Sequence, residues 1–323
     1  MQAKCFRGNQ TLFEKMTRKG FIGTWVAAMS VWGKNEKDES KEMALAPKSV
    51  RDVIENPPPP VQSWIETKLL PHNATLMMGG ESGIGKSFIS LEFQRALTTG
   101  TPLFRDPSFP VPHPCRVLYC EQEIGEVSLA DRFADTFSSH RPSEYSDRAH
   151  YISQEPGLLL CDDKKHKEMF ELLRDLKINV CILDPLSHFH EVDENSNTEM
   201  GEIFRRINIL KKACASQGLS FILTHHFKKA PIGQQEGYDI LSADNFRGSS
   251  RNLADPDTVI TVARIKNSDF SKPDPNGGPK FRGWKNKIGF PKLRHGEAPS
   301  PLIMEILPKG RHIVTITARN VKI

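Results

Sequence analysis

Ala74-Thr-Leu-Met-Met-Gly-Gly80-Glu-Ser-Gly-Ile-Gly85-Lys-Ser87 joins a short apolar run to a glycine-rich stretch that ends in Lys-Ser. Residues 80–87 match the pattern GxxxxGKS, and the apolar periodicity of residues 88–97 predicts a helix directly after it. Glycines let the backbone bend so that successive N–H groups face a phosphate, and the amino end of a helix adds partial positive charge. The order of strand, loop and helix therefore predicts a binding loop for a nucleoside triphosphate.

This loop offers side chains as well as backbone donors. We expect Lys86 to neutralise the β- and γ-phosphates of ATP and Ser87 to bind Mg²⁺, so that ATP and Mg²⁺ are the expected cofactors. The residues expected to contact the nucleotide are Gly80, Glu81, Ser82, Gly83, Ile84, Gly85, Lys86, Ser87 and Phe88.

Length and composition limit the class of protein. The 323 residues, 38% of them hydrophobic, suffice for one large α/β domain with extensions. The six cysteines form no CxxC pair, which predicts free thiols, neither disulfides nor zinc, and a reducing, cytoplasmic location. The longest apolar candidate, residues 21–32, falls well short of the roughly 20 residues that span a bilayer, so we expect no membrane association.

Composition shifts divide the chain into four parts. Residues 1–45 show no sustained period and predict a poorly ordered arm, and 46–60 are a proline-rich linker. Residues 61–266 form the expected ATPase core, and 267–323 a basic, β-rich extension of it. The basic residues of this extension suit a polyanionic partner, or they keep a solvated surface soluble.

Inside the core, short apolar runs alternate with helical patterns. We expect strands at residues 74–78, 116–120, 179–183, 220–224 and 258–262, and helices at 87–98, 129–138, 164–176 and 200–217. This alternation is typical of an α/β fold with a mostly parallel sheet covered by helices on both faces, which binds ligands at the carboxyl ends of its strands.

Two of the expected strands end in acidic residues. Asp184 closes an apolar run and is the expected Mg²⁺ ligand beside the phosphate loop. Because Pro185 follows it, the base that activates the attacking water must come from elsewhere. Glu123 is our choice for that base, and Glu121 is the alternative.

A third strand ends in Thr224-His225-His226. We expect His226 to hydrogen-bond the γ-phosphate and so to report hydrolysis. Paired histidines also suggest zinc, but adjacent residues of a strand point apart and no further ligand stands at suitable spacing. A metal site at His188 and His190 is a weaker alternative.

Taken together, these motifs resemble the RepA-like branch of the RecA-type ATPases, a group of hexameric replicative helicases. The resemblance spans about residues 48–315. It rests on Asn56–Pro60, Gly80–Ser87 with Thr99-Gly100, Val117–Glu123, Asp184–Phe189 with Glu191–Asn197, Thr224–Lys229, Arg247–Ser250 and Trp284–Gly289.

The resemblance implies a RecA-like core, a ring of six subunits with ATP between neighbours, and a cation supplied in trans to the γ-phosphate. Arg247 is the best candidate for that cation, although a surface arginine in a Gly-Ser loop has the same sequence. Lys285 matches a lysine of the same role, whereas Lys287 stands where many relatives carry arginine.

The family analogy also places the segments after Asp184 and His226 against single-stranded DNA. The first is acidic, and its Phe189 suits base stacking or the core equally well, whereas Lys228, Lys229 and residues 231–244 suit phosphate better.

The sequence therefore predicts an ATP-driven replicative DNA helicase or translocase, with replication proteins as possible partners. The alternative is a regulatory or scaffold ATPase whose nucleotide state controls protein assembly, and a module with degraded catalysis is a third reading.

Overall fold

The structure is a computed structural model that describes residues 49–155, 157–227, 241–272, 281–306 and 317–320. Contacts divide the chain into two compact units, residues 1–59 and 60–323. In the first unit, α3 (Val50–Glu55) begins where the Ser49 hydroxyl accepts a hydrogen bond from the Asp52 N–H at 3.0 Å. The predicted arm, residues 1–45, lies outside the described residues.

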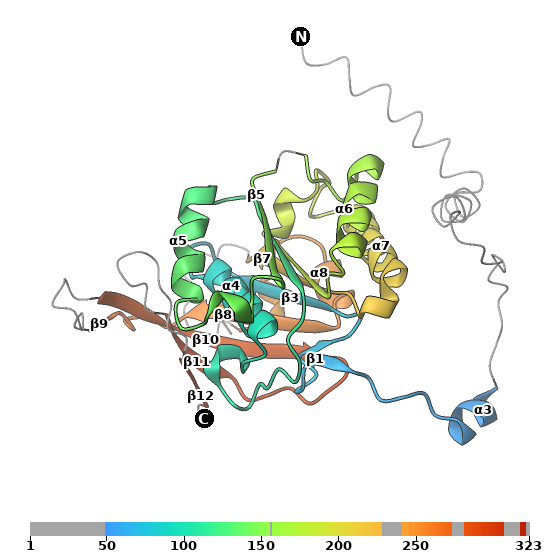
Figure 1. The fold of residues 1–323 in the computed structure, drawn as a ribbon, viewed down its shortest axis with the longest axis horizontal. Coiled ribbons are helices and arrows are strands. Elements are labelled where there is room, and N and C mark those ends of the chain that lie inside the picture. The colour runs from blue at the N-terminus through green and yellow to red at the C-terminus, as the bar shows by residue number, and fades with distance from the viewer. Residues whose placement is uncertain (1–48, 156, 228–240, 273–280, 307–316, 321–323) are drawn as a thin grey trace, which may run out of the picture. The chain divides into compact units, whose positions relative to one another are not determined.

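A ten-stranded sheet forms the centre of the second unit (Figure 1). Its strand order is β12-β11-β10-β8-β3-β7-β6-β4-β5, and β9 pairs with β10. The parallel strands are β3 (Thr75–Gly80), β4 (Val117–Glu121), β5 (Ala149–Ser153), β6 (Val180–Asp184), β7 (Ser220–His226) and β8 (Thr258–Arg264). The antiparallel strands are β9 (Phe270–Lys272), β10 (Phe281–Leu293), β11 (Leu302–Ile306) and β12 (Thr317–Asn320). β1 (Ser63–Ile65) and β2 (Leu70–Pro71) form a separate small antiparallel pair.

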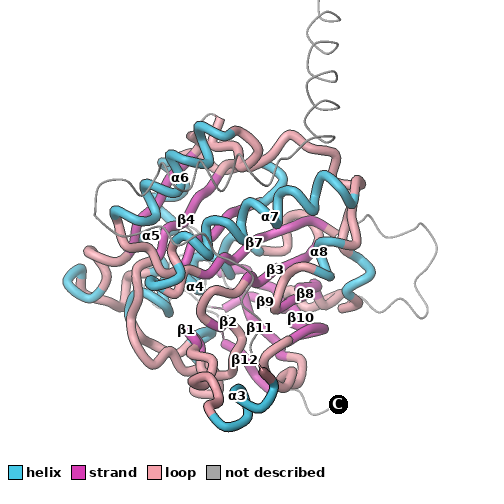
Figure 2. The backbone as a smooth tube through the Cα atoms, turned by 90° about the vertical axis from the view of Figure 1, so that its right-hand side faces the viewer, coloured by secondary structure: helices cyan, strands magenta, loops and turns pink. Residues whose placement is uncertain are grey.

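Helices cover both faces of this sheet. α4 (Lys86–Thr99) and α5 (Glu126–Thr136) pack on one face, and α6 (Asp163–Asp175) and α7 (Asn197–Ala213) on the other (Figures 1 and 2). The short α8 (Arg251–Ala254) contacts α7. Short 3-10 turns occupy Leu103–Arg105, Pro142–Glu144, Leu186–His188, Ala215–Gln217 and Ala243–Asn245.

Alternating side chains of the strands build two cores. Along β3, Leu76 and Met78 enter the core under α4, whereas Met77 enters the core under α7. All three side chains are fully buried, as expected for strands that are covered on both faces. The predicted α/β class, with a mostly parallel sheet and C-terminal strands, is confirmed.

α4 is buried almost all round, unlike the other long helices. Its buried Arg95 donates to Glu92 at 2.8 Å (Nε to Oε2), so the two charges neutralise each other inside the core. The helix begins after Gly85, which has a φ of 100° that only glycine adopts without strain, and ends at Gly100.

Most predicted elements appear with shifted ends. α7 stops at Ala213 rather than Gln217, and β5 and α8 were not predicted. Of the described cysteines, all are free; Cys161 is half-buried and the others are buried. Among the described helices, none combines the length and the apolar character that crossing a bilayer requires.

Candidate nucleotide-binding site

The carboxyl ends of four parallel strands meet at one edge of the sheet. Gly80 of β3 lies beside His226 of β7, and Glu121 of β4 beside Asp184 of β6. The predicted phosphate loop, acids and histidine therefore share one edge because their strands are in register.

Lys86 lies at the centre of this edge. Its Nζ donates to the carbonyl oxygens of Gly80 at 2.9 Å and Glu81 at 2.8 Å, and contacts His226 Nδ1 at 3.2 Å. Burial lowers the pKa of Lys86 to about 8, an effect that the charge of Asp184 partly opposes. An anion bound in the loop would supply the negative charge that this buried ammonium lacks.

Asp184 is held by two neutral donors. The Tyr119 hydroxyl donates to Oδ2 at 2.8 Å and the Thr224 hydroxyl to Oδ1 at 2.5 Å. Both donors come from the strands that flank β6, so the carboxylate is fixed at the strand end without being neutralised. A buried, oriented carboxylate together with the Ser87 hydroxyl is the hard oxygen donor set that Mg²⁺ takes, which fits the predicted metal site.

The two candidate bases differ in their surroundings. Oε1 of Glu121 accepts the N–H groups of Glu123 and Ile124, both at 2.5 Å, so this side chain closes the turn after β4. Its burial raises the pKa of Glu121. Glu123 is 44% exposed and its Oε1 lies 3.7 Å from His226 Nε2. Of these two candidates, Glu123 is therefore the one that meets solvent at this edge.

His226 lies between Lys86 and Glu123. With the Lys86 ammonium donating to Nδ1, the ring proton is on Nε2, which faces Glu123. Burial, and then the charge of Lys86, lowers the pKa of His226 and favours this neutral form. The histidine thus links the phosphate loop to the candidate base.

The preceding residue, His225, points to the other side of β7. Its Nε2 lies 2.9 Å from the Arg247 carbonyl oxygen and 3.1 Å from Asn252 Nδ2, and the Arg247 N–H donates to the His226 carbonyl at 3.1 Å. The end of β7 is therefore bonded directly to the segment that carries Arg247.

Arg247 and Lys285, the two cations predicted to act in trans, are paired within this chain. Arg247 Nε lies 3.4 Å from Glu194 Oε2, and the arginine side chain is 64% exposed. Lys285 Nζ lies 3.2 Å from Glu305 Oε1. Lys287 is half-buried on the same strand. The structure thus does not bring these three cations to the phosphate loop of their own subunit.

Of the described residues, the others predicted to contact DNA or a metal do not gather at the phosphate loop. Phe189 is fully buried in the core beside α7, so it is a core residue. His188 is exposed and His190 buried, and the described residues hold no cluster of three or more metal-ligating side chains. Lys228, Lys229 and residues 231–240 lie outside the described residues.

Sequence reasoning did not predict the contacts that four residues make at the site. Tyr119 and Thr224 orient Asp184, and Trp284 and Asn286 bond the phosphate loop. The signal in the sequence was the alternation of side chains along a strand, which places every second residue on the same face. Tyr119 lies two residues before Glu121, and Trp284 and Asn286 alternate with Lys285 and Lys287.

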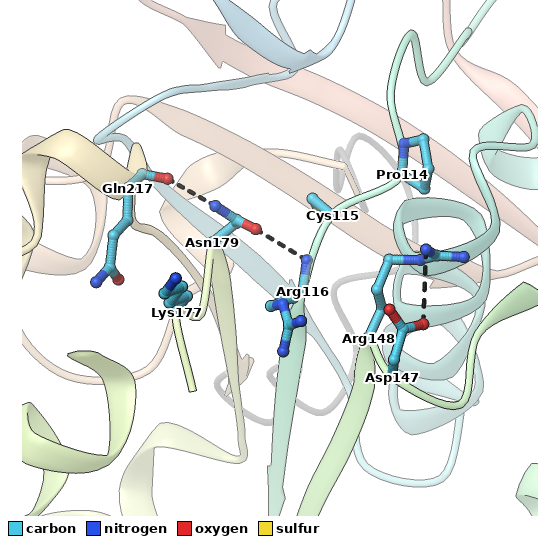
Figure 3. A pocket seen from close by; sticks show the side chains of 8 residues that line it. All are labelled: Pro114, Cys115, Arg116, Asp147, Arg148, Lys177, Asn179 and Gln217. Carbon is cyan, nitrogen blue, oxygen red and sulfur yellow. Dashed lines mark hydrogen bonds and ion pairs between the residues drawn. The ribbon is translucent and has the colours of Figure 1, made fainter. Parts of the chain in front are cut away.

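A basic pocket of about 400 Å³ lies at the opposite edge of the sheet, where β4, β5, β6 and β7 begin (Figure 3). Asn179 bridges two chain segments there, because it donates to the Gln217 carbonyl at 2.7 Å and accepts the Arg116 N–H at 2.9 Å. Arg148 is held by the Thr98 carbonyl at 2.8 Å. This pocket joins the strand starts and is separate from the phosphate loop. Its lining residues are Pro114, Cys115, Arg116, Asp147, Arg148, Lys177, Asn179 and Gln217.

Two comparisons bear on this geometry. The model of a family described as AAA domain matches residues 37–231, which is more than half of the chain and includes the phosphate loop, Glu123, Asp184 and His226. The chain matches none of the curated proteins with which it was compared.

Proposed function

Because the chain belongs to the AAA domain family and is a P-loop ATPase, we propose that it is a ring-forming motor of the RepA-like type that moves along single-stranded DNA. The observation that carries the proposal is the shared edge of Lys86, Glu123, Asp184 and His226. A loop that only bound nucleotide would need the lysine and the glycines, but not an exposed acid in contact with a histidine.

The residues suggest how hydrolysis proceeds. Lys86 and the backbone N–H groups of the loop bind the phosphates. Ser87 and Asp184 would hold Mg²⁺, which when bound would supply charge neutralisation of the phosphate oxygens. Glu123 accepts the proton of the attacking water. His226 turns its Nε2–H from Glu123 to the γ-phosphate, and loses that partner on hydrolysis.

The hydrogen bonds of β7 suggest how hydrolysis leads to movement. A shift of His226 displaces its carbonyl, which holds the Arg247 N–H, and His225, which contacts the Arg247 carbonyl. Arg247 is then repositioned toward the nucleotide of a neighbouring subunit. In the proposed ring, this couples turnover in one subunit to the next.

One observation favours the second candidate, a regulatory ATPase that controls protein assembly. The segment after β6 carries the exposed Glu191 and Asp193, and the mostly buried Glu194. Such a segment repels a DNA phosphate and suits a basic protein partner better.

The steady-state ATPase rate, measured with and without single-stranded DNA at low salt and at several protein concentrations, tests the proposal. The Lys86→Ala variant is the blank. A motor predicts stimulation by DNA that grows as the ring assembles. A rate that ignores DNA at every concentration favours the regulatory ATPase instead.

A further inference from the structure

We propose that Trp284 and Asn286 of β10 are positioning residues that aim the Gly85 N–H at the nucleotide phosphates. The inference deepens the proposed function, since it rests on ATP binding in the phosphate loop. It assigns part of the nucleotide site to a strand that lies outside the segment matched by the AAA domain.

Both side chains donate to one atom of the phosphate loop. Trp284 Nε1 lies 3.2 Å and Asn286 Nδ2 2.8 Å from the carbonyl oxygen of Ile84. A single carbonyl oxygen has two lone pairs, so these two donors use its full capacity. Ile84 is 3% exposed and Asn286 fully buried, so water does not compete for the Asn286 bond, whereas Trp284 is half-buried.

The peptide plane carries the effect to the phosphate. The Ile84–Gly85 peptide is trans, so its C=O and N–H point in opposite directions. With the Ile84 oxygen bonded toward β10, the Gly85 N–H points away from β10. Gly85 is also the residue before α4, whose first turn leaves its N–H groups without acceptors in the helix. The two donors thus fix one of the N–H groups that a phosphate accepts.

Packing keeps the loop in this place. A Cβ added to Gly85 would lie 2.8 Å from Ile306 Cδ1 of β11 and 3.5 Å from the Trp284 ring. The indole is also held by the Arg264 guanidinium, which lies over the ring at 5.1 Å from its centroid. β10 and β11 therefore form a close-fitting support for the loop.

Two substitutions remove the donors with little change in shape. Trp284→Phe keeps an aromatic ring, and Asn286→Leu keeps the volume of a buried side chain. Each leaves the Ile84 carbonyl one donor, so we expect ADP to bind about fivefold more weakly in either variant. The double variant leaves that carbonyl without any donor, and its loss should exceed the product of the two single losses.

Calorimetric titration with ADP, and separately with inorganic pyrophosphate, measures the effect. Both ligands should lose affinity by the same factor, because the Gly85 N–H contacts phosphate rather than base. The matched control is Trp64→Phe, which removes an indole N–H bonded at 3.1 Å to the Gly218 carbonyl at the other edge of the sheet. We expect this control to bind both ligands as the unsubstituted protein does.

The result that overturns the inference is a double variant that folds, as judged by its circular dichroism, and binds pyrophosphate with unchanged affinity. A loss for ADP alone also overturns it, since β10 would then contact the base. Failure of the premise, nucleotide binding in the phosphate loop, looks different, because Lys86→Ala would then bind ADP as tightly as the unsubstituted protein. Failure of the motor function leaves ADP and pyrophosphate binding as described and shows only as an ATPase rate that ignores DNA.

Discussion

Replacing Lys86 by methionine should stabilise the nucleotide-free protein while abolishing nucleotide binding. Lys86 is 6% exposed, and burial lowers its pKa from 10.5 to about 8. A tenfold change in proton affinity corresponds to about 1.4 kcal/mol, so the charged lysine destabilises the empty folded state by about 3 kcal/mol. Lys86→Met removes the charge and keeps the length of the chain.

The pH dependence distinguishes this cause from a packing effect. The folded state binds its proton less tightly than the unfolded state, so the destabilisation is complete below about pH 8 and disappears as the pH rises toward 10.5. Urea denaturation without nucleotide should therefore show Lys86→Met to be about 3 kcal/mol more stable near pH 7, and less than about 1 kcal/mol more stable near pH 10. A variant no more stable near pH 7, or a gap that persists near pH 10, refutes the reasoning.

The same pKa of Lys86 predicts that ATP affinity is constant below about pH 8 and falls by up to tenfold per pH unit above it, because bound phosphate requires the charged lysine. Calorimetry in buffers of different ionisation heat should therefore detect proton uptake on ATP binding near pH 8. Glu123→Gln should bind ATP with near-normal affinity and hydrolyse it about 100-fold more slowly, in a single-turnover assay. Glu121→Gln is its comparison, and a larger rate loss there would make Glu121 the base. Arg247→Ala should assemble like the unsubstituted protein by light scattering, yet lose about 100-fold or more in turnover. Normal turnover of that variant would remove Arg247 from the reaction.

The parts of the fold that could be predicted were those with continuous apolar runs. β3, β6 and β8 are buried on both faces, so nearly every residue in them is apolar or small. β5 is the edge strand of the sheet and is only half-buried, and its Ala-His-Tyr-Ile-Ser sequence gave no such run. The local sequence pattern therefore predicted the central strands of the sheet but not the edge strand β5.

The residues of the candidate site also fall into those that a local sequence pattern could predict and those that it could not. Residues at strand ends, such as Asp184 and His226, were predicted because the phosphate loop fixes which edge of a parallel sheet binds ligand. The donors to Asp184 depend on which strands flank β6, and the partners of Ile84 come from β10, about 200 residues away in sequence. Such contacts are set by sheet order and register, which a single sequence does not show.

The distance between the two edges of the sheet has a practical consequence for biophysical work. Strands β4, β5 and β6 each have five residues, so about 16 Å separates the basic pocket from the strand ends that carry Glu121 and Asp184. Lys177 is exposed at the pocket rim and follows α6. A fluorophore or surface tether attached at position 177 would therefore hold the protein for single-molecule recording without touching the residues that bind or cleave the nucleotide.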